Sequence, residues 1–136
     1  MNYTDKEKYG PNCIGQVIRI VDETELIINV SEYDITVGDK IVVYALGDTI
    51  KDLDGTELGK YECDKATLTV VTTTENYSIC KSEVIMKKSA IVVASDIFSS
   101  TYEGYKTLNV NKEQMKKIEI KNKDVIQLGD LVKKGW

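Results

Sequence analysis

The 136-residue sequence contains no histidine, and this absence narrows the chemistry that the chain can support. Histidine is the commonest general base and the commonest metal ligand in proteins, so neither a Ser-His-Asp nor a Cys-His mechanism can be assembled from this chain alone. The phosphate-binding patterns G-x-x-x-x-G-K-[ST] and G-x-G-x-x-G are also missing. These absences predict that the protein is not an enzyme and that it holds no cofactor.

Cysteine is scarce as well: the sequence has only Cys13, Cys63 and Cys80. Three is an odd number, and these cysteines are widely spaced and form no C-x-x-C pair. This usage favours a reducing compartment, and Cys80 is expected to be a buried thiol in an alternating strand. The N-terminus lacks the apolar core of a secretory signal, and the longest apolar runs fall far short of the roughly 20 residues of a membrane helix. We therefore expect a cytoplasmic protein with no membrane span; a mature exported fragment is the alternative.

Charge is divided unevenly along the chain, although the net charge is only −4. Residues 1–80 carry seven Lys and Arg against fifteen Asp and Glu, whereas residues 81–136 carry eleven against seven. A solvated surface is the simplest explanation, but such a division also favours self-association or the docking of an acidic face onto a basic one. It is not the strong basic stripe of a nucleic-acid-binding protein, so nucleic acid is not the expected partner.

Runs of β-branched residues separated by short polar turns predict an all-β fold of antiparallel strands. Residues 14–30 form one predicted hairpin and residues 60–81 a second, and the run 40–46 between them is apolar on both faces. A strand that is apolar on both faces is expected at the centre of a sheet. The predicted inward-facing residues are Val17, Ile20, Leu26, Ile28, Val30, Leu68 and Val70.

Glycine and aspartate mark the predicted turns. The stretches ITVGDKIV at 35–42 and IQLGDLV at 126–132 both place a Gly-Asp step before an apolar run, which predicts that the same bend starts two different strands. The expected turn residues are Gly38, Asp39, Asp54, Gly55, Gly59, Gly129 and Asp130.

The predicted hairpin end at residues 47–59 is rich in carboxylates, which raises the question of a calcium site. The calcium loop D-x-[DN]-x-[DN]-G-x5-E does not fit, because alignment on Gly55 puts Ile50 at the first ligand and Tyr61 at the bidentate glutamate. A solvated turn stabilised by Asx hydrogen bonds is the stronger interpretation. No metal ligand set is predicted.

A single domain is expected, with residues 1–12 as a flexible arm, 13–82 as the barrel core and 83–136 as an irregular extension. A final strand near residues 125–133 is expected to return to the barrel. Aromatic side chains interrupt the loop-like sequence of the extension and its end, which predicts an interaction surface that includes Phe98, Tyr102, Tyr105 and Trp136.

The order of motifs between residues 15 and 81 resembles a known family. It includes V-G-D-x-x-x-V-Y at 37–44, I-x-D-x-x-G-x-x-L-G at 50–59 and Y-S-x-C-K at 77–81. This order resembles the C-terminal domain of flagellar assembly protein T and related small bacterial β-barrel modules. The residues that carry the resemblance are Gly15, Val17, Ile20, Ile28, Asn29, Gly38, Val43, Tyr44, Ile50, Asp52, Gly55, Glu57, Leu58, Gly59, Leu68, Val70 and Ser78.

The resemblance implies a small SH3-like barrel that serves in the assembly of envelope or flagellar structures and has no catalytic residues to carry over. Leu53 stands where the relatives usually have proline, and residues 89–136 lie outside the match. From the residues themselves, an SH3-like or OB-like barrel of antiparallel strands is expected.

The sequence therefore predicts a non-catalytic β-barrel adaptor or assembly module that acts through a protein partner or through self-association. The alternative is a barrel that binds single-stranded nucleic acid, because small barrels often bind single strands through aromatic and basic side chains. In that case the binding surface is the Lys-rich stretch at residues 112–134.

Overall fold

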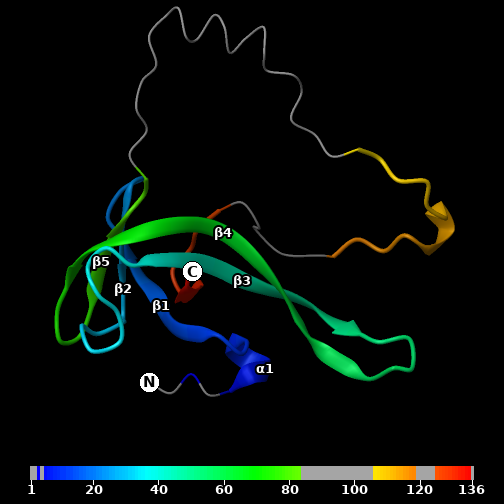
Figure 1. The fold of residues 1–136 in the computed structure, drawn as a ribbon, viewed down its shortest axis with the longest axis horizontal. Coiled ribbons are helices and arrows are strands. Elements are labelled where there is room, and N and C mark those ends of the chain that lie inside the picture. The colour runs from blue at the N-terminus through cyan, green and yellow to red at the C-terminus, as the bar shows by residue number, and fades with distance from the viewer. Residues whose placement is uncertain (1–2, 4, 84–105, 119–124, 136) are drawn as a thin grey trace, which may run out of the picture. The chain divides into compact units, whose positions relative to one another are not determined.

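The computed structural model describes residues 3, 5–83, 106–118 and 125–135, and these residues form an all-β fold with two short helical turns (Figure 1). The chain divides into two units, Met1–Glu83 with Ile118–Trp136, and Val84–Lys117. All the strands in the described residues belong to the first unit. The elements are α1 (Lys6–Tyr9), β1 (Cys13–Ile20), β2 (Glu25–Ile28), β3 (Lys40–Lys51), β4 (Glu57–Thr73), β5 (Ser78–Lys81), the 3₁₀ turn η1 (Lys112–Gln114) and β6 (Leu131–Lys134).

The six strands close into a ring in the order β1-β2-β5-β4-β3-β6, with β6 paired to both β3 and β1. Every pair of neighbouring strands is antiparallel. The expected all-β class and antiparallel pairing are confirmed. β3 has a partner on each side, as its apolar sequence predicts. The returning strand β6 occupies residues 131–134, at the end of the stretch expected near 125–133.

One apolar core fills the ring. Its buried members are Val17, Leu26, Ile28, Val30, Ile35, Ile41, Val43, Leu68, Val70, Cys80 and Val132. Buried Ser78 is the polar exception, and its hydroxyl donates a hydrogen bond to the Val30 carbonyl oxygen at 2.6 Å. Because alternation along each strand sends every second side chain inward, this core contains nearly all the residues predicted to face inward.

Ile20 departs from that prediction. A register shift in β1 between Val17 and Arg19 places Ile20 opposite the buried Leu26, so the two residues share a face of the sheet. Ile20 is nevertheless 42% exposed, because it is the last residue of β1 and lines an open hollow of about 370 Å³. The predicted face is therefore correct, and the predicted burial is not.

The turn before β3 is held by its own aspartate and by β4. The Asp39 N–H donates to the Thr36 carbonyl oxygen at 3.0 Å, and the Asp39 carboxylate accepts the Thr36 N–H at 2.9 Å. Gly38 donates its N–H to the Val70 carbonyl oxygen at 2.8 Å, and Val70 donates to the Asp39 carbonyl oxygen at 2.9 Å. Gly38 has φ 97°, the left-handed conformation that the third residue of a type II turn requires.

The turn before β6 repeats all four of these hydrogen bonds on β1. The Asp130 N–H donates to the Gln127 carbonyl oxygen at 3.1 Å, and the Asp130 carboxylate accepts the Gln127 N–H at 2.8 Å. Gly129, with φ 88°, donates to the Val17 carbonyl oxygen at 2.8 Å, and Val17 donates to the Asp130 carbonyl oxygen at 2.8 Å. The two Gly-Asp stretches therefore build the same turn at the start of two strands.

These twin turns belong to two equivalent halves of the ring, β3-β4-β5 and β6-β1-β2. Exchanging β3 with β6, β4 with β1, and β5 with β2 leaves the strand order unchanged. The register obeys the same exchange, since the equivalent residues Val42 and Lys133 pair where β3 and β6 meet, and the equivalent residues Ile27 and Ile79 pair where β2 and β5 meet. In the second half the chain ends fall between β6 and β1, so this half is assembled from both ends of the sequence.

Candidate functional site

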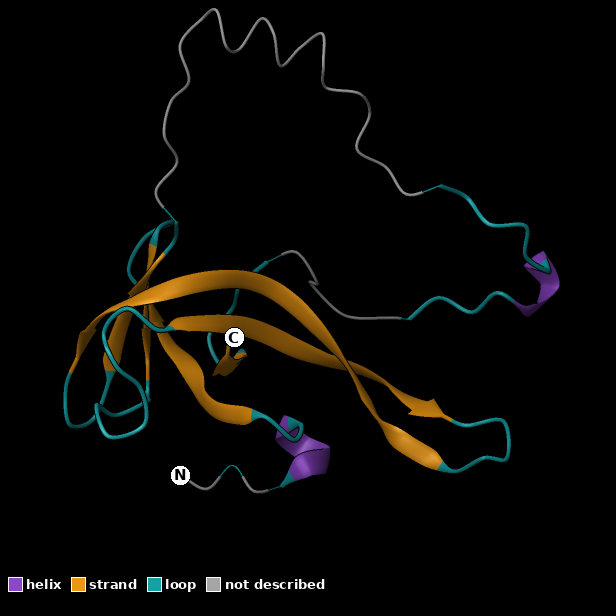
Figure 2. Ribbon diagram, viewed as in Figure 1, coloured by secondary structure: helices purple, strands orange, loops and turns teal. Residues whose placement is uncertain are grey.

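β3 and β4 continue past the ring as a two-stranded ribbon, residues 45–63, which projects to the right in Figure 1 and whose strands are drawn in orange in Figure 2. β6 pairs with β3 only at residues 41–44, and β5 pairs with β4 only at residues 69–73. Within the described residues, the strands of the ribbon pair only with each other. The strands also extend into the long hairpin end expected at 47–59, which leaves a turn of only residues 52–56.

The tip of the ribbon is a tight turn stabilised by its own carboxylates. Asp52 donates its N–H to the Thr56 carbonyl oxygen at 2.8 Å, and Gly55, at φ 92°, donates to the Asp52 carbonyl oxygen at 3.0 Å. The Asp54 carboxylate accepts the Thr56 N–H at 2.9 Å, and hydrogen bonds from Thr56 lower the pKa of Asp54. No group of three or more Cys, Asp and Glu side chains in the described residues is placed to hold a metal ion.

Apolar side chains on the ribbon are exposed to solvent. Leu53 stands at the tip and is fully exposed, Leu58 is 63% exposed, and Ile50 and Tyr61 are exposed to a lesser degree. Single exposed apolar residues are normal on a protein surface, whereas these four lie on a projecting hairpin that pairs with no other described strand. This arrangement makes the ribbon the candidate functional site.

Lys133 of β6 holds the base of the ribbon. Its ammonium lies 2.8 Å from Asp64 Oδ1, 3.3 Å from Glu62 Oε2 and 4.8 Å from the centre of the Tyr44 ring. Burial disfavours the charged form of Lys133, but the hydrogen bond to Asp64 and the charge of Glu62 outweigh it and raise the pKa. Glu62 Oε1 is buried, and within the described residues it has no hydrogen-bond partner.

The N-terminal segment packs against the same base. The Tyr44 hydroxyl donates to the Tyr9 carbonyl oxygen at 2.6 Å, and the buried Tyr9 ring meets Tyr3 edge to face with centroids 4.9 Å apart. Burial raises the pKa of Tyr44 well above its usual range. Residues 1–12 were expected to form a flexible arm; in their described part, Tyr9 packs against Tyr44 of β3, and the Tyr3 hydroxyl accepts a hydrogen bond from the Asn29 side chain at 2.8 Å.

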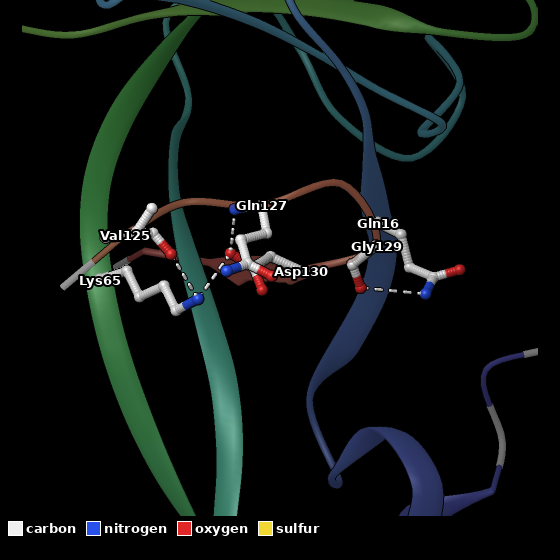
Figure 3. A network of polar contacts seen from close by, with 6 residues as sticks. All are labelled: Gln16, Lys65, Val125, Gln127, Gly129 and Asp130. Carbon is white, nitrogen blue, oxygen red and sulfur yellow. Dashed lines mark hydrogen bonds and ion pairs between the residues drawn. The ribbon is translucent and has the colours of Figure 1, made fainter. Parts of the chain in front are cut away.

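A buried ion pair fixes the ribbon strand β4 to the turn before β6, as Figure 3 shows. The Lys65 ammonium donates to Asp130 Oδ2 at 2.8 Å and to the Val125 carbonyl oxygen at 2.7 Å. The Lys65 side chain is only 2% exposed and that of Asp130 only 12%. On the other side of the turn, the Gln16 side chain donates to the Gly129 carbonyl oxygen at 3.1 Å. The second Gly-Asp turn therefore joins β1, β4 and β6.

A hollow of about 720 Å³ beside the base of the ribbon is lined by Cys13, Asp64 and Lys133 among others. Asp64 and Lys133 already form an ion pair, and the Cys13 thiol donates to the Gly15 carbonyl oxygen at 3.3 Å. Cys80 is fully buried in the core, and burial raises the pKa of its thiol to about 12.

The predicted site residues have separate locations. Gly38 and Asp39 lie in the turn before β3, Gly129 and Asp130 lie in its twin before β6, and Asp54 and Gly55 lie at the tip of the ribbon. Gly59, at φ 133°, lies in the ribbon strand β4. The predicted aromatic surface formed by Phe98, Tyr102, Tyr105 and Trp136 lies outside the described residues.

Sequence reasoning did not identify the apolar surface of the ribbon. The available signal was Leu53, an apolar residue between two aspartates in the stretch D-L-D-G, where a purely solvated turn favours polar residues. The Lys65–Asp130 pair had no local signal, because its partners are 65 residues apart.

Comparison with protein-family models and with curated proteins gave no match to this chain. The resemblance to the C-terminal domain of flagellar assembly protein T therefore stays a prediction. No helix in the described ranges is long and apolar enough to cross a membrane.

Proposed function

We propose that the protein is a non-catalytic adaptor or assembly module, built on an SH3-like or OB-like barrel, that acts through protein–protein contacts made by the ribbon. The observation that carries the proposal is the exposure of Ile50, Leu53, Leu58 and Tyr61 on one projecting hairpin. Fully burying a leucine side chain against a partner favours association by about 1.5–3 kcal/mol. Burial of these exposed side chains against a partner is therefore favourable.

The ring itself does not need the ribbon, which supports a role outside the fold. β3 and β4 have 12 and 17 residues, whereas their equivalents β6 and β1 have 4 and 8. The shorter pair closes its half of the ring with the same Gly-Asp turn. The additional length of β3 and β4 is thus available for binding.

The attachment of the ribbon favours a preorganised contact surface. Lys133 binds Glu62 and Asp64 at its base, and Lys65 binds Asp130 close by. A surface that is already ordered loses less conformational entropy when it binds a partner. These ion pairs therefore help the ribbon to present its apolar side chains in a fixed orientation.

A non-catalytic role is proposed because the chain contains no histidine and because burial raises the pKa of the Cys80 thiol to about 12. The cysteines Cys13, Cys63 and Cys80 are all free, which suits the cytoplasmic location that we propose.

Single-stranded nucleic acid has less support as a partner. Lys133, within the Lys-rich stretch 112–134, is already paired with Glu62 and Asp64. Residues 106–118 contain no aromatic side chain on which a base could stack. Binding of a single-stranded oligonucleotide that weakens steeply with added salt would favour this alternative over protein contacts.

Affinity capture on the immobilised full chain tests the proposal. The Leu53→Ser/Leu58→Ser variant is compared with Leu128→Ser, a matched control because Leu128 is 64% exposed in the turn before β6, outside ribbon residues 45–63. We expect the ribbon variant to lose a partner that both the wild type and the control retain, and the purified partner to rebind only to those two. Equal capture by both variants would show that the ribbon is not the contact surface.

A further inference from the structure

The charge of the ribbon suggests the chemistry of its partner. Its carboxylates are Asp48, Asp52, Asp54, Glu57 and Glu62, and its cations are Lys51 and Lys60. An acidic surface with exposed apolar side chains fits a partner that combines apolar side chains with an excess of positive charge.

The chain itself contains such a segment, residues 106–118. It carries the cations Lys106, Lys112, Lys116 and Lys117 against the single carboxylate of Glu113, and every residue in it is exposed. It also exposes the apolar side chains Leu108, Val110, Met115 and Ile118. Glu62 of the ribbon is already paired with Lys133, and the remaining ribbon carboxylates still outnumber its lysines, so the charge excess of the segment is opposite in sign to that of the ribbon.

Part of this segment has a defined local structure. Residues 112–114 form the 3₁₀ turn η1, and the Asn111 side chain caps it by accepting the Glu113 N–H at 3.0 Å. Leu108 and Val110 precede this turn and are two residues apart, a spacing that puts both side chains on one face of an extended chain. The segment can thus present apolar and basic groups together.

We propose that the ribbon of one copy binds residues 106–118 of a second copy of this chain. This inference rests on the proposed function and names the partner of the same surface. A chain that carries both complementary surfaces forms the contact twice in a twofold dimer, which doubles the buried area. Opposite charges align the two copies, and the leucines of the ribbon pack against the apolar side chains of the segment.

Side-chain packing, rather than addition of a strand, is the mode of contact. The register of the ribbon shifts between Leu46 and Thr49 and again between Ile50 and Lys51. Such bulges twist a strand edge and interrupt the regular row of backbone groups that a further strand needs. The exposed side chains therefore carry the contact.

Two charge-reversed full-length variants test this proposal in sedimentation velocity experiments. The ribbon variant is Asp52→Lys/Glu57→Lys, which keeps the Asp54 cap of the turn, and the segment variant is Lys112→Glu/Lys116→Glu/Lys117→Glu. We expect the wild type to dimerise and each variant alone to dimerise about tenfold or more weakly, because each now places like charges together. An equimolar mixture of the two variants should recover dimers, since both contacts in the mixed dimer again join opposite charges.

Salt and a second type of variant serve as controls. Raising the salt from about 0.1 M to about 1 M shortens the Debye length from about 10 Å to about 3 Å, so the wild-type dimer should weaken. If a charge-reversed variant fails to fold, Leu53→Ser/Leu58→Ser tests the apolar half of the same contact, with Leu128→Ser as its control.

A monomeric wild type, or a mixture of variants that associates no better than each variant alone, would overturn this inference. The proposed function is tested separately by affinity capture. Ribbon-dependent capture of a different protein by a monomeric chain would leave the proposed function standing and remove the second copy as its partner.

Discussion

The contribution of the buried Lys65–Asp130 ion pair to stability can be measured against an internal control. The control is the turn before β3, which has the same hydrogen bonds as the turn before β6 but, among the described residues, no such ion pair. Asp39 and Asp130 accept the same turn N–H in equivalent positions, at 2.9 and 2.8 Å. Only Asp130 also binds a buried cation, the ammonium of Lys65. We therefore compare Asp39→Ala with Asp130→Ala, because the loss of the turn hydrogen bond is common to both variants.

The expected difference follows from the burial of Lys65. Loss of the turn hydrogen bond alone, in Asp39→Ala, costs about 1 kcal/mol of unfolding free energy. Asp130→Ala also leaves the Lys65 ammonium buried with the Val125 carbonyl oxygen as its remaining partner among the described residues, and breaking a buried pair costs roughly 3–5 kcal/mol. Asp130→Ala should therefore be less stable than Asp39→Ala by about 2–4 kcal/mol.

Urea unfolding followed by far-ultraviolet circular dichroism measures this difference. With a slope of about 2 kcal/mol per molar urea, the midpoints of Asp39→Ala and Asp130→Ala should differ by about 1–2 M. The double variant Lys65→Met/Asp130→Ala should regain part of the loss, because it removes the unpaired charge. Equal midpoints for the two single variants would refute the assignment of Lys65–Asp130 as a stabilising junction.

Three further predictions concern stability and reactivity. Because the pKa of Tyr44 is raised in the folded protein, the unfolded tyrosine ionises first as the pH rises above about 10, and the folded state loses stability there. The melting temperature of Tyr44→Phe should therefore decline less steeply at alkaline pH than that of the wild type. Gly38→Val and Gly129→Val should each lower the unfolding free energy by about 1–2 kcal/mol through backbone strain alone, since a Cβ at either position meets open space, and an unchanged melting temperature in both would contradict this. Cys80 should react with a thiol reagent only as fast as the protein unfolds. Rapid labelling of all three cysteines in the native protein would show that the Cys80 thiol is not buried.

The parts of the fold that depend on local pattern were predictable. Alternation identified the inward residues of β2 and β4, because the side-chain period of a strand is fixed by its backbone geometry. The repeated Gly-Asp step indicated that one turn starts two strands, since glycine accepts the positive φ that the turn requires. The structure adds that both turns bind a neighbouring strand through the same hydrogen bonds, at Val70 and at Val17.

The parts that depend on distant contacts were not predictable. The return of a final strand to the barrel was predicted, but its pairing with β1, which closes the ring, was not. The attachment of Tyr9 to Tyr44 and the pairing of Lys65 with Asp130 also join residues that no local pattern connects. The length of the ribbon was underestimated for a related reason, because polar residues at 47–59 resemble a loop but adopt strand pairing when a facing strand supplies partners.

Isotope-mixed cross-linking probes our claim that the ribbon of one copy contacts residues 106–118 of another. Unlabelled and ¹⁵N-labelled full-length chains are mixed and treated with a carbodiimide, which joins carboxylates to nearby lysines without a spacer. Mass spectrometry should find peptides that link Asp52 or Glu57 to Lys116 or Lys117, with one peptide labelled and the other unlabelled. Links found only within peptides of the same isotope, or no link between these residues, would contradict the claim.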